Sequence, residues 1–250
     1  MRMNRLNEME QYILDHGTVS LDTLSNHFEV STNTIRRDLN ELTARGHVAK
    51  VYGGVSARND SGPLPMVVRS ATNSSSKQQI GRLASELVHD NDTIFLDSGS
   101  TVLCMLPHLA KKDGITIVTH SLSAMYEASK YPSLQVIALG GLYNQATSSY
   151  VGISTLEALS RISTDAVFIA ATGVSLERGL TNTTYFEAEI KRKVVQCSSK
   201  IILLADSSKF GKSSTISFFP FDQLYAVVTE QKPPKEYLNA IKKANIQLLI

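Results

Sequence analysis

Three stretches near the start of the chain place apolar residues at the spacings of three and four that an amphipathic helix requires. They predict helices over 4–16, over the short segment 20–28 and over 32–44. The apolar positions are Leu6, Met9, Ile13 and Leu14, then Leu21, Leu24 and Phe28, then Ile35, Leu39 and Leu42. Gly17 ends the first helix, and Ser20 caps the second. The second and third helices, joined by a short turn, predict a helix-turn-helix unit.

The third predicted helix has an exposed face that suggests chemistry. Ser31 can cap its first free N–H groups, and Gly46 stands where a left-handed residue ends a helix. The N-terminal half projects hydroxyl, amide and guanidinium groups. These suit a major groove, because Arg can pair with guanine, Asn with adenine, and a short hydroxyl side chain with phosphate or a thymine methyl. The alternative is a polar helix face that contacts only water.

Charge supports a nucleic-acid partner locally rather than in total. The formal net charge is only +2, but residues 31–58 carry five basic side chains against two acidic ones, whereas residues 1–30 carry two against five. After Gly46, apolar and polar residues alternate on either side of Gly53 and Gly54, which predicts a small hairpin with a glycine turn. Lys50 and Arg58 add cations to this hairpin, where a phosphate backbone is expected.

Beyond residue 76 the pattern changes to short apolar runs separated by segments of helical period. The runs are TIFL from Thr93, ITIV from Ile115, QVIAL from Gln135, AVFIA from Ala166, IILLA from Ile201 and YAVVT from Tyr225. The helical segments are 77–88, 122–129, 156–161, 185–197 and 235–244. Strands rich in Val and Ile with a helix between most of them predict an α/β domain with a largely parallel sheet covered on both faces.

The two patterns imply two domains. A chain of 250 residues is too long for one DNA-binding module. Residues 59–75 are polar and contain Gly62, Pro63 and Pro65, which is typical of a linker or an extended arm. We therefore expect a DNA-binding domain over 1–58, a linker or arm over 59–75 and an α/β domain over 76–250.

The ends of the predicted strands carry the candidate ligand chemistry, because ligands of parallel sheets bind there. The first run is followed by DSGST, residues 97–101, a small polar turn that opens a helix and suits a phosphate. Hydroxyls, small residues and a lysine also follow later runs, in THS, GG, ATG and ADSSKFG. Together they favour a polyhydroxy ligand that carries a phosphate. Taken alone, DSGST is equally compatible with a structural helix cap.

Other titratable residues add little. Glu187 and Lys191 stand four apart on the helix 185–197, so the first interpretation is an exposed ion pair on the helix face, and the second is a contact with a ligand or another subunit. No metal site, disulfide or cofactor is expected, because the remaining candidates lack ligand spacing or clustered partners: His89, His108, His120, Cys104 and Cys197. No stretch has the apolar length of a signal peptide or a membrane span, so we expect a soluble cytoplasmic protein without a membrane partner.

Residues 20–55, SLDTLSNHFEVSTNTIRRDLNELTARGHVAKVYGGV, closely resemble the DNA-binding domain of the DeoR family of bacterial transcription regulators, a winged helix-turn-helix. The signature is TIRRDLNEL, the helix-ending Gly46 and the glycine pair; Lys50 and Tyr52 stand where family members more often carry Arg and His. With the polar helix face, the resemblance implies double-stranded operator DNA as a partner. The expected DNA-binding residues are Ser31, Thr32, Asn33, Thr34, Arg36, Arg37, Asn40, Lys50, Tyr52, Gly53 and Arg58.

The chain from about Ser76 onward resembles the DeoR-type sensor domain, which is similar in fold to ribose-5-phosphate isomerase. The matching segments are DSGST, THSL, LGG, ATGV, GLT, EAEIKR and ADSSKFG. The resemblance implies a phosphorylated sugar as effector, with the phosphate on the DSGST turn. The expected effector-binding residues are Asp97, Ser98, Gly99, Ser100, Thr101, Thr119, His120, Gly140, Gly141, Gly173 and Lys209, with Lys77 as a further candidate.

An isomerase would need a carboxylate base at the ligand. The enzymes that this domain resembles carry acidic residues where this chain has Ala171, Thr172 and Gly173, and only Asp97 and Asp206 remain at the edge of the site. We therefore expect a binding pocket without catalytic residues. The favoured hypothesis is a repressor of carbohydrate-metabolism genes, a homodimer or homotetramer on paired half-sites that is controlled by the sugar phosphate. The alternatives are a sugar-phosphate isomerase with an appended DNA-binding module and a non-specific DNA-coating protein.

Overall fold

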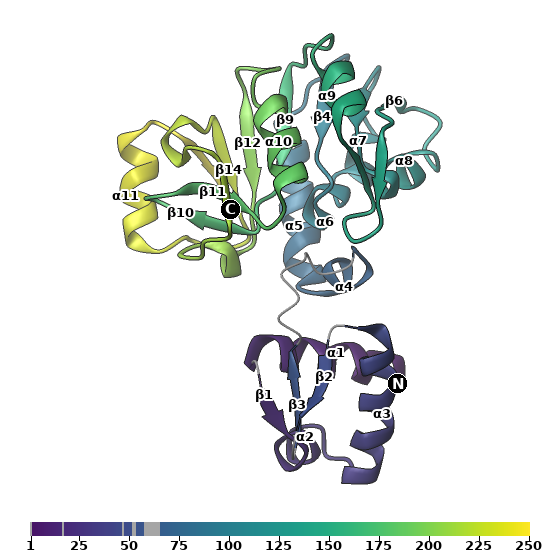
Figure 1. The fold of residues 1–250 in the computed structure, drawn as a ribbon. Helices are drawn as coiled ribbons and strands as arrows, with labels where there is room; N and C mark the ends of the chain where they lie inside the picture. Colours follow the sequence, from purple (N-terminus) through teal and green to yellow (C-terminus); the bar gives the residue numbers. More distant parts are fainter. Residues whose placement is uncertain (1, 17, 47, 52–53, 58–65) are drawn as a thin grey trace. The chain divides into compact units, whose positions relative to one another are not determined.

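The protein is described by a computed structural model over residues 2–16, 18–46, 48–51, 54–57 and 66–250. The chain divides into two compact units, Met1–Leu64 and Pro65–Ile250 (Figure 1). No helix in the described ranges has both the length and the apolar character needed to cross a bilayer.

The first unit is a helix-turn-helix flanked by a small antiparallel sheet. Its elements are α1 (Arg2–His16), β1 (Thr18–Ser20), α2 (Leu21–His27), α3 (Thr32–Arg45), β2 (Val48–Val51) and β3 (Gly54–Ala57). The sheet has the order β1-β3-β2. The three predicted helices and the paired hairpin strands are confirmed, whereas the three-residue strand β1 was not predicted. Apolar stripes of the helices meet the sheet in one core, made by Leu6, Met9, Ile13, Leu24, Ile35, Leu39, Leu42, Val48 and Val55 among others.

Two ion pairs tie α1 to α3. Arg5 Nη2 lies 2.8 Å from Asp38 Oδ2, and the Asp38 side chain is almost fully buried. Arg45 Nη1 lies 3.2 Å from the buried carboxylate of Glu10 and is also close to Glu41. Arg45 is therefore engaged within the unit, although it contributes to the positive charge counted along this stretch of sequence.

The second unit contains a seven-stranded parallel sheet of order β15-β14-β12-β9-β4-β5-β6. Its strands are β4 (Thr93–Leu96), β5 (Thr116–Thr119), β6 (Gln135–Ala138), β9 (Ala166–Ile169), β12 (Ile201–Leu204), β14 (Ala226–Val228) and β15 (Gln247–Leu249). The six apolar runs predicted as strands are confirmed. The seventh strand, β15, was missed because it is short, begins with an exposed Gln and lies at the sheet edge.

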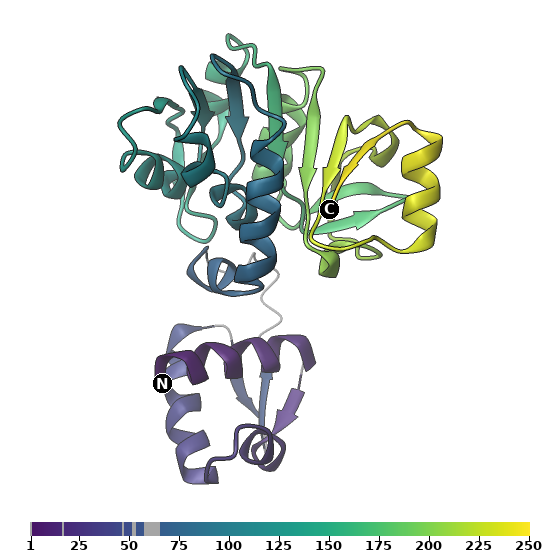
Figure 2. The ribbon, with the colours of Figure 1, turned by 180° about the vertical axis from the view of Figure 1, so that it is seen from behind.

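Alternate strand residues enter two separate cores, so both faces of the sheet are covered as predicted. On β4, Ile94 and Leu96 join one core and Phe95 the other. The core that contains Ile94 and Leu96 is completed by α5 (Ser74–Ser85), α6 (Ser100–Leu103), α7 (Leu106–Leu109) and α8 (Leu122–Ala128). The core that contains Phe95 is completed by α9 (Ile153–Leu159), α10 (Tyr185–Val194) and α11 (Lys235–Lys243). Figure 1 shows α9 and α10 in front of the sheet, and Figure 2 shows α5 on the opposite side.

Several small elements were not predicted. They are the pair β7 (Leu142–Asn144) and β8 (Ser149–Val151), the sheet formed by β10 (Gly173–Ser175), β11 (Gly179–Asn182) and β13 (Ile216–Phe219), the 3-10 turns η1 (Ser207–Lys209) and η2 (Phe221–Gln223), and α4 (Met66–Ala71). Helix α4 falls in the stretch 59–75 that we expected to be a linker or arm. It belongs to the second unit, where Met66 is buried.

A glycine sets the spacing between α5 and α6. An added Cβ on Gly81 of α5 would lie 2.5 Å from the backbone carbonyl carbon of Cys104, which ends α6. Only a residue without a side chain permits this approach. The contact fixes the position of α6, and with it the DSGST turn, whose last two residues begin α6.

Candidate DNA-reading surface and sensor site

Helix α3 has the two ends that its sequence predicts. Ser31 has an extended conformation, with φ −62° and ψ 151°, and its hydroxyl accepts the backbone N–H of Thr34 at 3.3 Å. Gly46 takes the left-handed conformation with φ +91°. The hydroxyls of Ser31 and Thr34 also lie 3.0 Å apart, so both are engaged in capping the helix. Any phosphate contact from this end would have to share those hydroxyls.

The exposed face of α3 carries most of the predicted DNA-binding side chains. Asn33, Arg36, Arg37 and Asn40 are exposed, and their spacings of three and four place them on one side of the helix, opposite the buried stripe. Lys50 of β2 donates a hydrogen bond to Asn40 Oδ1. The structure therefore brings a hairpin cation to the reading face. Thr32 is half-buried, and the predicted contacts Tyr52, Gly53 and Arg58 lie outside the described residues.

In the second unit, the DSGST turn follows β4 and lies against α10. Asp97 is fully buried, and its Oδ2 lies 2.6 Å from Lys191 Nζ and accepts the Ala170 N–H at 3.0 Å. Lys191 also donates to the Ala170 carbonyl at 2.6 Å. At Gly99 an added Cβ would collide with the Ala170 side chain, so the turn requires glycine.

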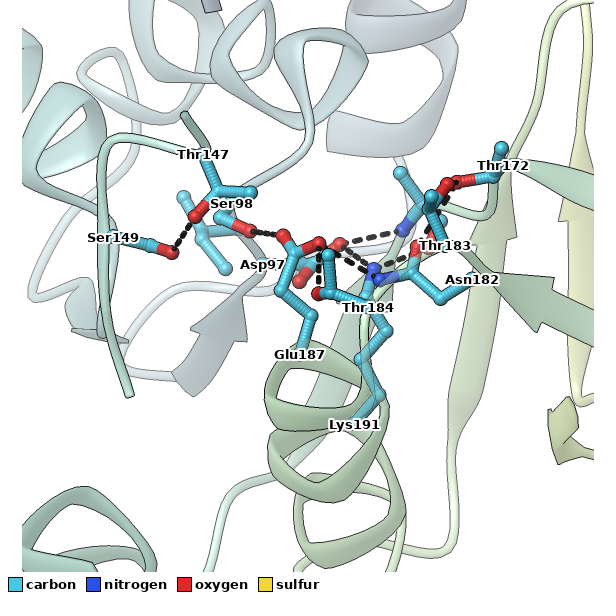
Figure 3. A network of polar contacts seen from close by, with 12 residues as sticks. Asp97, Ser98, Thr147, Ser149, Thr172, Asn182, Thr183, Thr184, Glu187 and Lys191 are labelled. Atoms are coloured by element: carbon cyan, nitrogen blue, oxygen red, sulfur yellow. Dashed lines mark hydrogen bonds and ion pairs between the residues drawn. The ribbon is translucent and has the colours of Figure 1, made fainter. Parts of the chain in front are cut away.

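The interpretation of Glu187 and Lys191 as an exposed ion pair is wrong. Both are about 95% buried, and they rise from α10 toward different partners (Figure 3). Lys191 pairs with Asp97, whereas Glu187 Oε1 accepts from the Ser98 hydroxyl at 3.3 Å. Glu187 Oε2 accepts from Asn182 Nδ2 at 2.9 Å and from the Thr184 hydroxyl at 3.1 Å. The two residues share a helix stripe with buried Ile190 and Val194, a signal that sequence reasoning could have used.

Two buried polar atoms beside this cluster have no hydrogen-bond partner among the described residues. They are Asp97 Oδ1 and Nδ1 of His120, whose side chain is 1% exposed and stacks on Phe95. Thr119 is engaged, because its hydroxyl donates to the Leu96 carbonyl at 2.7 Å and accepts the Ser121 N–H. Buried polar atoms in native proteins are nearly always hydrogen-bonded, so these two atoms call for a partner outside the described side chains.

Burial and charge set the protonation states of the cluster. Burial raises the pKa of Asp97, but the adjacent Lys191 ammonium and His120 lower it, and the net shift is downward. Burial lowers the pKa of His120 by more than the carboxylates of Asp97 and Glu187 raise it. The cluster therefore holds an ionised Asp97 and a neutral imidazole near neutral pH, which can donate or accept a hydrogen bond.

Two further predicted residues, Lys77 and Lys209, supply cations near the DSGST turn. Burial, with a smaller contribution from Lys209, lowers the pKa of Lys77 to about 8, although Asp206 raises it. Lys77 donates to the carbonyls of Arg69 and, at 2.7 Å, Thr72. Lys209 ends η1, which Asp206 caps. Asp206 and Lys209 both act on the charge of Lys77, so the structure brings the two predicted lysines to the same region.

The three remaining predicted glycines have structural roles. The Gly140 carbonyl accepts from Thr155 of α9 at 2.8 Å, and an added Cβ on Gly141 would collide with the Thr155 hydroxyl. An added Cβ on Gly173 would lie 2.5 Å from the Lys212 carbonyl. Gly141 and Gly173 allow this close packing, whereas an added Cβ on Gly140 would meet no atom within 4 Å. No described hydrogen bond links the three glycines to Asp97.

A cavity of about 1050 Å³ opens beside the turn. Of the predicted effector residues it reaches only Ser100; Asp97, Ser98, Thr119 and His120 are closed off by their neighbours. The cavity walls come from α4, α5, α6, α7, α8 and the β7–β8 turn, and include Ser70, Gln78, Cys104 and Tyr126. A ligand that approaches through this cavity meets Ser100 before the buried cluster.

An exposed reading helix in one unit and a buried polar cluster beside a cavity in the other define a DNA-binding transcription regulator with a sensor domain. Family models give the same division: residues 5–61 match the DeoR-like helix-turn-helix domain, and residues 72–231 match the DeoR C terminal sensor domain. The chain belongs to the DeoR family.

Curated relatives extend over nearly the whole chain. The HTH-type transcriptional regulator IolR of Bacillus subtilis is 40% identical over 95% of this chain and 94% of its own length. The Glycerol-3-phosphate regulon repressor of Escherichia coli is 28% identical over 98% of this chain and 97% of its own. Among solved structures, ribose 5-phosphate isomerase A from Methanocaldococcus jannaschii matches 56% of this chain and 55% of its own, with 18% identity and a TM-score of 0.42. A likeness of that size adds nothing about ligand or activity.

Proposed function

We propose that this protein is a repressor of carbohydrate-metabolism genes whose affinity for operator DNA is set by a phosphorylated sugar bound in the second unit. The names of the relatives support this proposal, since they include the Glycerol-3-phosphate regulon repressor and the HTH-type transcriptional repressor GlcR of Bacillus subtilis. Because operators lie on cytoplasmic DNA in bacteria, the protein acts in the cytoplasm.

The DNA-binding function rests on residues 1–58 and the exposed face of α3. Asn33, Arg36, Arg37 and Asn40 meet base edges and phosphates, and Lys50 reaches the backbone beside them. One such helix covers few base pairs, so the functional species is a homodimer or homotetramer that places two helices on paired half-sites.

The sensor function rests mainly on one observation, the two buried polar atoms without a partner at Asp97 and His120. Asp97 opens the hydroxyl-rich DSGST turn and His120 follows β5, so each can pair with a sugar hydroxyl once a ligand has passed Ser100. Ser100, the residue of the DSGST turn that lines the cavity, binds the phosphate together with Lys77, and Lys209 lies around the sugar. Helix α6 has only four residues, so its N-terminus adds little. Asn182, Thr184 and Glu187 are further effector-binding candidates from the buried cluster.

We propose that the pocket binds without catalysis. Glu187 lies at the site as a third carboxylate, in addition to Asp97 and Asp206, but both of its oxygens accept hydrogen bonds from protein side chains. Asp97 is held ionised by Lys191. The net downward shift of its pKa makes Asp97 a weak base, so turnover of pentose or hexose phosphates is not expected.

Thermal shift of the full chain across a panel of pentose and hexose phosphates tests the sensor function, because a ligand of the native state raises the melting temperature. The compound with the largest shift should also change the affinity for an operator selected from genomic fragments. Glu187→Gln should weaken ligand binding about tenfold, since a hydrogen bond to a charged group contributes roughly 1.5–3 kcal/mol. Glu189→Gln is the matched control, because Glu189 is on the same helix but pairs with Arg192 at the surface. A panel without any shift, or equal effects of both variants, would count against the sensor function.

A further inference from the structure

The backbone carbonyl of Arg69, in α4, accepts hydrogen bonds from two side chains that we assign to the ligand phosphate, Ser100 and Lys77. The Ser100 hydroxyl donates to this carbonyl at 3.3 Å, and Lys77 Nζ donates to the same oxygen. A hydroxyl has a single proton to donate. Ser100 can therefore serve either the Arg69 carbonyl or a phosphate oxygen, but not both.

The Arg69 side chain extends from α4 toward the same cluster. Its Nη2 donates to the Thr147 carbonyl, in the turn between β7 and β8, at 3.4 Å. Burial lowers the pKa of Arg69, while the carboxylates of Glu187 and Asp97 raise it, so this cation lies near both acids. The backbone carbonyl and the side chain of Arg69 therefore both hold α4 at the site.

The turn after α4 is held in the same way. Lys77 donates to the Thr72 carbonyl at 2.7 Å, and Asn73 Nδ2 donates to Asp206 Oδ1 at 3.4 Å. Met66 and Ser70 of α4 also line the cavity that leads to Ser100. A ligand that enters this cavity therefore meets α4 at the place where the phosphate donors are already in use.

We propose that α4 is an internal competitor of the effector: the phosphate takes the Ser100 hydroxyl from the Arg69 carbonyl, binds the remaining N–H of Lys77 and thereby loosens α4. This inference rests on the proposed sensor function and adds a route for its regulation. A phosphate dianion is a stronger acceptor for a hydroxyl proton than a neutral carbonyl is, so the exchange at Ser100 favours the ligand. Helix α4 begins two residues after the first unit ends, so loosening it acts on the segment that joins the sensor to the DNA-binding unit.

Hydrogen exchange measured by mass spectrometry on the full chain tests this competition at the amides of residues 66–71. The probes are inorganic phosphate and the sugar phosphate that gives the largest thermal shift in the panel. Bound ligand should accelerate exchange in α4 while it slows exchange near Asp97. A ligand that raises the melting temperature but leaves α4 unchanged, or protects it, overturns the competition.

Two variants test α4 without any ligand, so that failure of the sensor function can be told apart from failure of this proposal. Ser100→Ala removes one hydrogen bond to Arg69 and should speed exchange in α4 roughly fivefold, the size of one net hydrogen bond. Lys77→Met should have the same direction if Ser100→Ala does not fold. Arg82→Ala, which removes only a surface pair with Glu86, should leave α4 unchanged. If no phosphate compound binds, the sensor function fails. Unchanged exchange in Ser100→Ala would then also overturn the proposal that Ser100 holds α4 in place. Faster exchange in Ser100→Ala would support that part of the proposal.

Discussion

At the scale of single residues, the buried pair of Asp97 and Lys191 is expected to have a large effect on stability. Both side chains are at most 5% exposed and lie 2.6 Å apart. Lys191→Met should lower the free energy of unfolding by about 3–5 kcal/mol, because it leaves a buried carboxylate without its counter-ion. The double variant Asp97→Asn with Lys191→Met should recover most of that loss in urea titrations.

The control for this prediction is Lys130→Met. Lys130 pairs with Glu127 at 2.6 Å, but the side chains are 51% and 33% exposed. Its loss should change stability by at most about 1 kcal/mol. Equal losses for Lys191→Met and Lys130→Met would show that the buried pair is not needed for stability.

Lys77 predicts how ligand affinity depends on pH. Its pKa is lowered to about 8 in the ligand-free protein. A bound phosphate favours the ammonium form and raises this pKa, so binding near pH 8 should take up protons, and affinity should fall as pH rises above about 8. Calorimetric titration of the ligand in buffers of different ionisation enthalpy measures the number of protons taken up on binding. Lys77→Arg keeps its charge and should flatten the pH dependence between 7 and 9; an unchanged slope would exclude Lys77 as its source.

At the scale of elements, α3 predicts different roles for two adjacent arginines. Arg36 and Arg37 are both exposed but point about 100° apart around the helix. One should read bases and the other should contact phosphate. In binding titrations over a range of salt, Arg→Ala at the base reader should relax operator preference by about 1–3 kcal/mol, and at the phosphate contact it should weaken all DNA alike and reduce the salt slope by about one. Identical sequence losses and salt slopes for the two variants would contradict this division.

The elements that sequence could predict are those whose own residues determine them. The capped α3 and the apolar strands of the sheet have their signals within a few residues, and the structure confirms them. Helix α4, strand β15 and the small sheet of β10, β11 and β13 have short, partly polar sequences, and long-range packing stabilises them.

The buried cluster shows the same limit at the level of the site. The DSGST turn could be predicted from the sequence because it directly follows an apolar run. The spacing of Glu187 and Lys191 showed that they share a face of α10, but not that this face is buried against Asp97. Arg69 gave no signal at all, because it lies in a stretch whose Gly, Pro and Ser content is typical of a linker.

At the scale of the whole molecule, the two units have cores with no residue in common. Calorimetry should therefore show two unfolding transitions, and a sugar phosphate should raise only that of the larger unit. Leu39→Ala, in the core of the first unit, should lower the other transition and cost about 2–5 kcal/mol. A ligand that raises both transitions equally would show that the units unfold together.

The close approach of Gly81 to Cys104 has a consequence for genetic selections. Under the proposed function, alleles that bind operator but do not respond to the effector need not change any residue that contacts the effector. Gly81→Ala would push α6 away from α5 and shift the DSGST turn, although Gly81 itself is absent from the cavity wall. We expect such an allele to keep normal operator binding and to need a much higher effector concentration for a response in a reporter assay. Ligand-blind alleles should therefore map to the α5–α6 contact as well as to the pocket.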